Sequence, residues 1–263
     1  MKLSRFLLAV AAVFGLASCL EIKSTVIVNK DGTATVEETA LLGAQLAAMM
    51  AQGGGGGGPG DQLKGLVMDK EKAAARAKQL GEGVTVKSVE EVTVDGKTGS
   101  KVTFAVADIT KLKYEPNTPD EKKDDKKTEA MVFTLEGSKL TITNPEADKK
   151  QGDGTPKPKK SEAEIAQMKA QIGMMKPMFA GMRITVEVKS ASGIASTNAS
   201  HPNGDAITYM DVEMDKLLNN VEAFGEIMES GEGSMSMADA AKKFKGIEGL
   251  KIEGQKTVTI ELK

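Results

Sequence analysis

The sequence predicts an α+β fold, in which mainly antiparallel β-hairpins pack with several amphipathic helices and long flexible insertions interrupt the chain. Runs of alternating apolar and polar residues flank short turn signals such as Asp31-Gly32, Asp95-Gly96 and Asn203-Gly204, and such turns join antiparallel strands. Other segments carry apolar residues three and four positions apart, the spacing of helices that bury one face. Two-faced hairpins with helices gathered between them indicate an α+β fold rather than a parallel α/β fold.

The expected strands follow from alternation on either side of turn residues. Three hairpins are expected, at 22–28 with 33–38, 84–94 with 102–106, and 131–135 with 140–142. Further strands are expected at 184–188, 193–200, 205–212 and 258–262. In the second hairpin the valines at 84, 86, 92 and 94 share one parity, so they are expected on one face, and Gly99 is assigned to the turn.

The expected helices follow from apolar spacing and from capping residues. They cover 42–50, 69–80, 161–182, 213–229 and 236–244, with a short helical turn at 108–112. Asp69 and Asp108 are suited to cap the helices that follow them. The helix at 161–182 carries the longest apolar stripe, and Pro177 is expected to kink it or to end it early.

Three segments are expected to be flexible because they lack apolar residues or consist of glycine. They are 53–60, 115–127 and 145–160. The glycine run at 53–60 is not a phosphate-binding loop, because the Gly-Lys-Ser/Thr that such a loop requires does not follow it.

The first eighteen residues have the three-part pattern of a secretory signal peptide. Lys2 and Arg5 form a positive start, 6–16 is an uninterrupted apolar run, and the small residues Ala17 and Ser18 follow. The apolar run is about half of the ~20 residues that a membrane-spanning helix needs. The sequence therefore predicts a signal peptide at 1–18 that is removed from the mature protein.

The only cysteine follows directly. Leu16-Ala17-Ser18-Cys19 resembles the lipobox of bacterial lipoproteins. The resemblance implies thioether attachment of a diacylglycerol to Cys19, cleavage between Ser18 and Cys19, and a lipid-anchored domain at 19–263. Two acyl chains, such as palmitate, anchor a protein stably, whereas one chain binds only marginally. Leu20 in place of aspartate permits the periplasmic side of the outer membrane in a Gram-negative cell.

Two blocks of the mature chain are similar to LppM-type bacterial lipoprotein domains. One is Ile22–Glu38, a strand, an Asp-Gly turn and a strand just after the cysteine; the other is Arg183–Asp211, which contains a strand, a glycine, Ser-Thr-Asn, a turn glycine and a strand with an aromatic residue near its end. Ser192 and Tyr209 stand where that family tends to have proline and tryptophan. The resemblance implies an envelope lipoprotein with an α+β domain that can interact with lipid, and it supplies no catalytic residue.

The composition argues against several functions. Removing 1–18 takes away Lys2 and Arg5, so the formal charge falls from −2 to about −4, and nucleic acid is not an expected partner. With Cys19 acylated, His201 is the only residue left of the types that dominate zinc sites, so no metal and no cofactor are expected. His201 is expected in an exposed loop, and the adjacent acids Glu37-Glu38 and Glu90-Glu91 on solvated faces. No catalytic residues are assigned.

The Met-rich stripe of the 161–182 helix has two interpretations. Its residues Met168, Ile172, Met175, Phe179 and Met182 are expected in a packed core, but thioether side chains also suit an irregular apolar ligand, so they form a candidate acyl-chain groove.

The sequence thus predicts a membrane-anchored lipoprotein of the bacterial cell envelope that acts as a non-enzymatic binding or structural module, with the membrane and a lipid or another envelope protein as partners. A carrier or sensor of lipid that uses the 161–182 helix is the alternative, and a hydrolytic enzyme ranks third.

Overall fold

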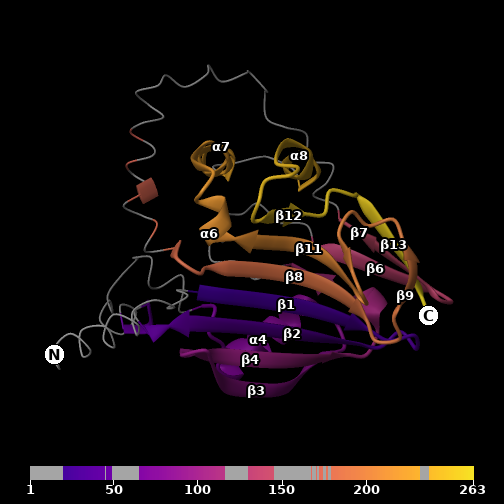
Figure 1. The fold of residues 1–263 in the computed structure, drawn as a ribbon. Helices are drawn as coiled ribbons and strands as arrows, with labels where there is room; N and C mark the ends of the chain where they lie inside the picture. The colour runs from indigo at the N-terminus through magenta and orange to yellow at the C-terminus, as the bar shows by residue number, and fades with distance from the viewer. Residues whose placement is uncertain are drawn as a thin grey trace, which may run out of the picture.

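The computed structural model describes residues 20–44, 46–48, 65–115, 130–144, 179–231 and 237–263, together with the helical residues 167, 170, 172, 173 and 176. The flexible segments expected at 53–60 and 145–160, and that at 115–127 apart from Glu115, lie outside these residues. The described part is a mixed α+β structure with two β-sheets, as the sequence predicts (Figure 1).

The large sheet consists of β1 (Leu20–Val28), β2 (Ala34–Gly43), β3 (Val84–Val94), β4 (Lys97–Val106), β8 (Arg183–Ser190), β10 (Pro202–Asn203), β11 (Ala206–Glu213) and β12 (Leu250–Ile252). The small sheet consists of β5 (Lys113–Tyr114), β6 (Met131–Glu136), β7 (Lys139–Thr143), β9 (Ile194–Thr197) and β13 (Thr257–Leu262). The helices are α4 (Lys70–Leu80), the 3-10 helix η1 (Ile109–Lys111), α6 (Met214–Leu217), α7 (Val221–Gly231) and α8 (Met237–Lys243).

The large sheet has the order β10-β11-β8-β1-β2-β4-β3, with β12 paired to β11, and the small sheet has the order β5-β6-β7-β13-β9. Among the described strands β1 and β8 form a parallel pair, and all other pairs are antiparallel. In Figure 1 the strands of the large sheet are stacked across the view and the small sheet lies at their right-hand end. The three expected hairpins are present.

The expectation that four valines of β3 share one face is wrong, because a β-bulge lies between Val86 and Ser88. Val86 lies opposite Phe104, and after the bulge Val89 lies opposite Val102, so both pack against the core. Val92 and Val94 therefore lie on the other face of the sheet.

Gly99 lies inside β4, opposite Leu41, and not in the turn where it was expected. A Cβ atom at this position would be within 3 Å of the backbone oxygen and carbonyl carbon of Ala40, which is closer than any real Cβ contact. The neighbouring strand therefore approaches a position that only glycine can occupy.

Gly99→Ala should lower the free energy of unfolding by about 1–3 kcal/mol, because the new methyl group forces β2 and β4 apart. Gly173→Ala is the control, since no atom of the described residues lies within 4 Å of a Cβ atom built there. Urea unfolding followed by circular dichroism measures both changes. If Gly99→Ala were as stable as the wild-type protein, β2 and β4 would be able to move apart without a cost in free energy, and the prediction would be wrong.

Helix α4 confirms the helix expected at 69–80. The Asp69 side chain accepts a hydrogen bond from the Lys72 backbone N–H at 2.8 Å, which satisfies one of the free amides of the first turn. Ala73, Ala77 and Leu80 are buried and face the sheet. Gly81 follows with a φ of 129°, a conformation that side-chain-bearing residues rarely adopt.

Two expected helices are shorter than the spacing of their apolar residues suggests. Leu42 belongs to β2 and is buried there, and helical residues begin only at 44. The helix expected at 213–229 is divided into α6 and α7, because Asn220 accepts a hydrogen bond from the Ala223 N–H at 3.1 Å and so begins a new helix.

The helical turn expected at 108–112 is η1, and its Asp108 side chain accepts hydrogen bonds from the backbone N–H and the hydroxyl of Thr110. These bonds hold the pKa of Asp108 below its usual value of 3.8.

The lowered pKa of Asp108 predicts how the stability of the fold depends on pH. A depressed carboxyl pKa stabilises the fold above the unfolded pKa, and this contribution is lost as the pH falls through the folded pKa. Asp108→Asn should therefore be less stable than the wild-type protein at pH 7, and the difference should become smaller as the pH falls below ~4. Urea titrations at pH 7 and at pH 3 measure this change.

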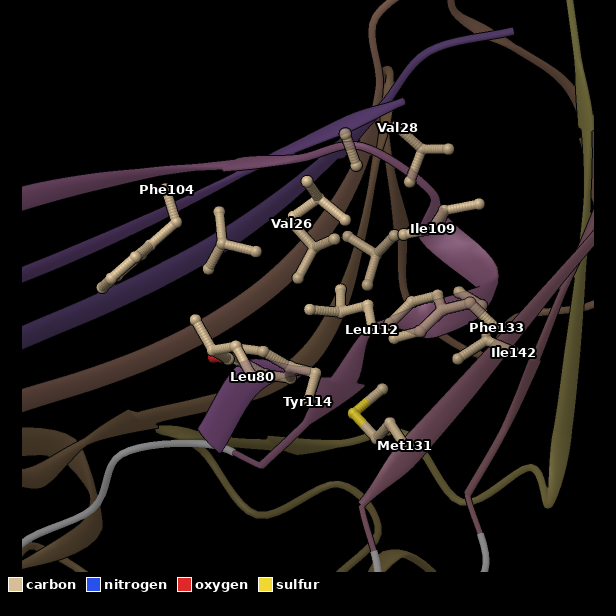
Figure 2. Close-up of a cluster of buried hydrophobic side chains, with 14 of the residues drawn as sticks. Val26, Val28, Leu80, Phe104, Ile109, Leu112, Tyr114, Met131, Phe133 and Ile142 are labelled. Atoms are coloured by element: carbon tan, nitrogen blue, oxygen red, sulfur yellow. The ribbon is translucent and has the colours of Figure 1, made fainter. Parts of the chain in front are cut away.

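The main core lies between the two sheets and α4. Figure 2 shows its centre, where Val26 and Phe104 of the large sheet, Leu80 of α4 and Phe133 of the small sheet surround one apolar space. Two smaller clusters cover the other end of the large sheet. One contains Leu20, Ile22, Ala40, Leu42 and Leu66, and the other contains Ile172, Met214, Leu217, Leu218 and Phe224.

Candidate functional site

A buried polar row crosses the apolar face of the large sheet. Along β1 the side chains that face the core are apolar except for Ser24, and along β2 they are apolar except for Glu38, which lies directly opposite Ser24. Glu38 is 3% exposed. A carboxylate this deeply buried needs a charged partner that also donates hydrogen bonds.

Arg76 of α4 is that partner. Its Nη2 donates to Oε1 of Glu38 at 2.7 Å, and its Nε lies 3.2 Å from both carboxylate oxygens. The same Nη2 also donates to the backbone oxygen of Glu115 at 2.6 Å. The guanidinium therefore joins the helix to β2 and to the residue that follows β5.

Tyr114 of β5 lies in the same part of the core. Its hydroxyl is buried and makes no hydrogen bond within the described part of the structure. Burial, and then the negative charge of Glu38, raise the pKa of Tyr114 well above its usual value of 10. The phenol therefore stays protonated at physiological pH. Because both oxygens of Glu38 are held by Arg76, this cluster is a structural connection rather than a free acid–base pair.

The opposite face of the large sheet carries ion pairs whose basic side chains are partly exposed, although Asp211 itself is buried. Arg183 of β8 donates to both carboxylate oxygens of Asp211 of β11 at 2.9 Å, and Thr185 Oγ1 donates to Oδ1 at 3.3 Å. The hydrogen bonds to Asp211 raise the pKa of Arg183 further. On the same face Lys101 lies 3.2 Å from Glu37. Glu37 thus has the half-exposed position expected for it, whereas the expectation of a solvated Glu38 is wrong.

A surface groove with a volume of about 660 Å³ lies between the β3–β4 hairpin and the start of α4. Its apolar wall is formed by Leu42, Ala47, Val67, Met68 and Val89. Its polar and charged lining includes Asp69, Lys70, Lys72, Glu90, Glu91 and Ser100. The backbone N–H of Met68 donates to Ser100 Oγ at 2.9 Å, which fixes one wall of the groove to β4. The volume is in the range of small-molecule sites.

The residues of the Met-rich stripe lie elsewhere. Ile172 is buried and packs with Met214, Leu217 and Phe224. Phe179 and Met182 are partly buried and pack against the same cluster. Met168 and Met175 lie outside the described residues. A ligand groove along this stripe stays a prediction, and the three described members contact other core residues.

His201 lies just before β10 and is half-buried rather than exposed. Its Nε2 lies 3.2 Å from the backbone oxygen of Ile252. Next to it the fully buried carboxylate of Glu253 accepts hydrogen bonds from the Ser200 N–H, the Ser200 hydroxyl and the Gln255 N–H at 2.6 to 2.9 Å. Glu253 therefore holds two loops together. No pattern in the sequence marks it, because its partners are mostly backbone groups.

Neither a metal site nor a membrane-spanning helix is found in the described part of the chain. No group of three or more histidine, cysteine, aspartate and glutamate side chains among these residues is arranged to hold a metal ion. None of the described helices has the length and apolar character needed to cross a membrane. Ser18 and Cys19 lie outside the described residues, and β1 begins at Leu20, directly after them.

The fold and the sites above define an α+β protein with two β-sheets and an interior ion pair. No protein-family model matches the chain, and no curated protein matches it. Among solved structures the chain is similar to the folded domain of the Mycobacterium tuberculosis LppM protein, determined by NMR. The two sequences are 11% identical. The match covers 76% of this chain and 85% of the LppM chain, and its TM-score is 0.35. LppM is thus a distant structural neighbour.

Proposed function

We propose that the protein is a lipoprotein of the bacterial cell envelope, anchored through a diacylglycerol on Cys19, and that its domain is a non-enzymatic binding or structural module. The observation that carries the proposal is the position of β1. The lipobox-like stretch ends at Cys19, and the central strand of the large sheet begins one residue later.

Both neighbours of β1 come from later in the chain. Leu20 pairs with Leu42 of β2, and Glu21 pairs with Arg183 of β8. The described fold thus places its own strands on both sides of the residues that directly follow Cys19. This arrangement is expected of a domain that remains intact after a signal peptide is removed.

The non-enzymatic role is supported by the way the buried charged groups are used. Glu38 is bound by Arg76, Glu253 by loop amides and a hydroxyl, and Asp211 by Arg183. A general acid or base needs a free position for substrate, and these three carboxylates bind protein groups instead. A hydrolytic role ranks last for this reason.

The anchor can be tested by the intact mass of the protein extracted from membranes of a bacterial host. We expect the mass of residues 19–263 increased by a diacylglycerol, with or without a further acyl chain. The mass of the whole chain, or of 19–263 without lipid, would contradict the proposal.

A carrier or sensor of an apolar ligand is the second candidate, and the surface groove favours it. The apolar wall formed by Leu42, Val67 and Val89 beside charged side chains suits an amphipathic molecule. Native mass spectrometry of the protein extracted in a mild detergent would show a bound lipid, and Val89→Asp should then remove it. A ligand-free wild-type protein would leave the structural module as the better description.

A further inference from the structure

The proposed anchor is joined to a rigid part of the fold without a linker. Leu20, the residue after Cys19, is 2% exposed and belongs to a buried cluster with Leu42 and Leu66. The following residue, Glu21, pairs with Leu41 of β2 on one side and with Arg183 of β8 on the other. Consecutive Cα atoms are only 3.8 Å apart, so a lipid on Cys19 holds the start of β1 at the membrane surface.

The register of the large sheet shows which other residues share this end. Leu42 lies opposite Leu20, Thr98 lies opposite Leu42, and Thr93 lies opposite Thr98. The β3–β4 turn at Asp95-Gly96 therefore projects from the same end of the sheet. Val94, which precedes this turn, is 47% exposed, and among the described residues only Val132 of β6, in the small sheet, is a comparably exposed large apolar side chain, at 44%.

The other end of the sheet is far from the anchor. Val28 ends β1, and the β1–β2 turn with Lys30 follows it. The nine residues of β1 span roughly 25 Å at about 3.3 Å per residue. The small sheet lies at this far end, since the Gly32 oxygen accepts a hydrogen bond from Ile109 of η1 and Leu135 of β6 lies against Gly32.

We infer that the end of the large sheet formed by Leu20, the β3–β4 turn and the start of β8 faces the lipid surface, and that the small sheet points away from it. The inference rests on the proposed acylation of Cys19. It assigns the bilayer surface as the partner of this end, with Val94 as its exposed apolar contact.

The test uses the mature protein, extracted from membranes of the bacterial host that produces it, with one added cysteine, since an acylated Cys19 leaves no other thiol. Val94→Cys places a fluorescent label at the end near the anchor, and Lys30→Cys places the same label in the exposed β1–β2 turn at the far end. Each labelled protein is added to preformed vesicles of phosphatidylethanolamine and phosphatidylglycerol that contain a lipid with a nitroxide on its headgroup. Circular dichroism checks that both variants are folded.

We expect the nitroxide to quench the label at 94 several-fold more strongly than the label at 30. Equal quenching, or stronger quenching at 30, would overturn the orientation. Flotation of the vesicles separates this failure from failure of the anchor: protein that floats with the vesicles but shows the wrong quenching order disproves only the orientation, whereas protein that does not float disproves the acylation itself.

Discussion

Arg76→Met is expected to lower the free energy of unfolding by about 3–5 kcal/mol, because it leaves the carboxylate of Glu38 buried without its charged partner. Both oxygens of Glu38 lie within 3.2 Å of the Arg76 side chain, and Glu38 is 3% exposed. The loss also frees the backbone oxygen of Glu115, which Arg76 binds at 2.6 Å. Urea unfolding of the purified protein measures the change as a shift of the midpoint.

A matched control, Lys101 of β4 with Glu37 of β2, lies on the opposite face of the large sheet. Lys101→Met removes the partner of Glu37, but both side chains are about one-third exposed, so the expected change is below ~1 kcal/mol. The double substitution Arg76→Met with Glu38→Leu should recover most of the stability, because it removes both buried charges and keeps the volume. A loss as small as that of Lys101→Met would show that water reaches Glu38.

Cys19→Ala is expected to remove the lipid-anchored mature form, so that the protein is either released from the membrane fraction as a free domain or remains as an uncleaved precursor of higher mass. Each buried methylene of an acyl chain contributes about 0.8 kcal/mol to membrane binding, so two chains hold the protein and none leaves it free. Fractionation of cells that produce each form, with immunoblotting against the domain, measures the change.

Ser18→Ala is the control for this substitution, because it keeps a small residue beside the cysteine and should leave the protein in the membrane fraction. Incorporation of labelled palmitate provides a second measurement. If Cys19→Ala incorporated as much label as the wild-type protein, the attachment would be on another residue and the proposed anchor would be wrong.

The hairpins could be predicted because their information is local. Asp95 and Gly96 both adopt positive φ, 50° and 75°, as a two-residue hairpin turn requires, and the alternation on each side sets the strands. The β-bulge after Val86 could not be predicted, because the extra residue becomes visible only when β3 is placed against β4. The pairing of β1 with β8 likewise joins segments that no local pattern connects.

The interior ion pair between Arg76 and Glu38 is a second feature that could not be predicted from the sequence. Glu37 and Glu38 look alike in sequence, and only the alternation of β2 places one toward solvent and the other toward the core. The partner of Glu38 is on α4, 38 positions later, and spacing within a helix does not reveal which sheet residue it meets. The sequence could nevertheless have raised the question, since Glu38 has the same parity as Val36 and Ala40, both of which are buried.

The parallel pairing of β1 with β8 delays completion of the large sheet during synthesis. In a chain exported amino end first, β1 and β2 emerge early, but Val28 must wait for its partner Ser190, about 160 residues and roughly 8–30 s of synthesis later at 5–20 residues per second. Until then one edge of β1 has no neighbouring strand, and the large sheet stays incomplete. A domain of this topology stays open until most of its length has been made, and this delay suits the proposed export through a translocation pore.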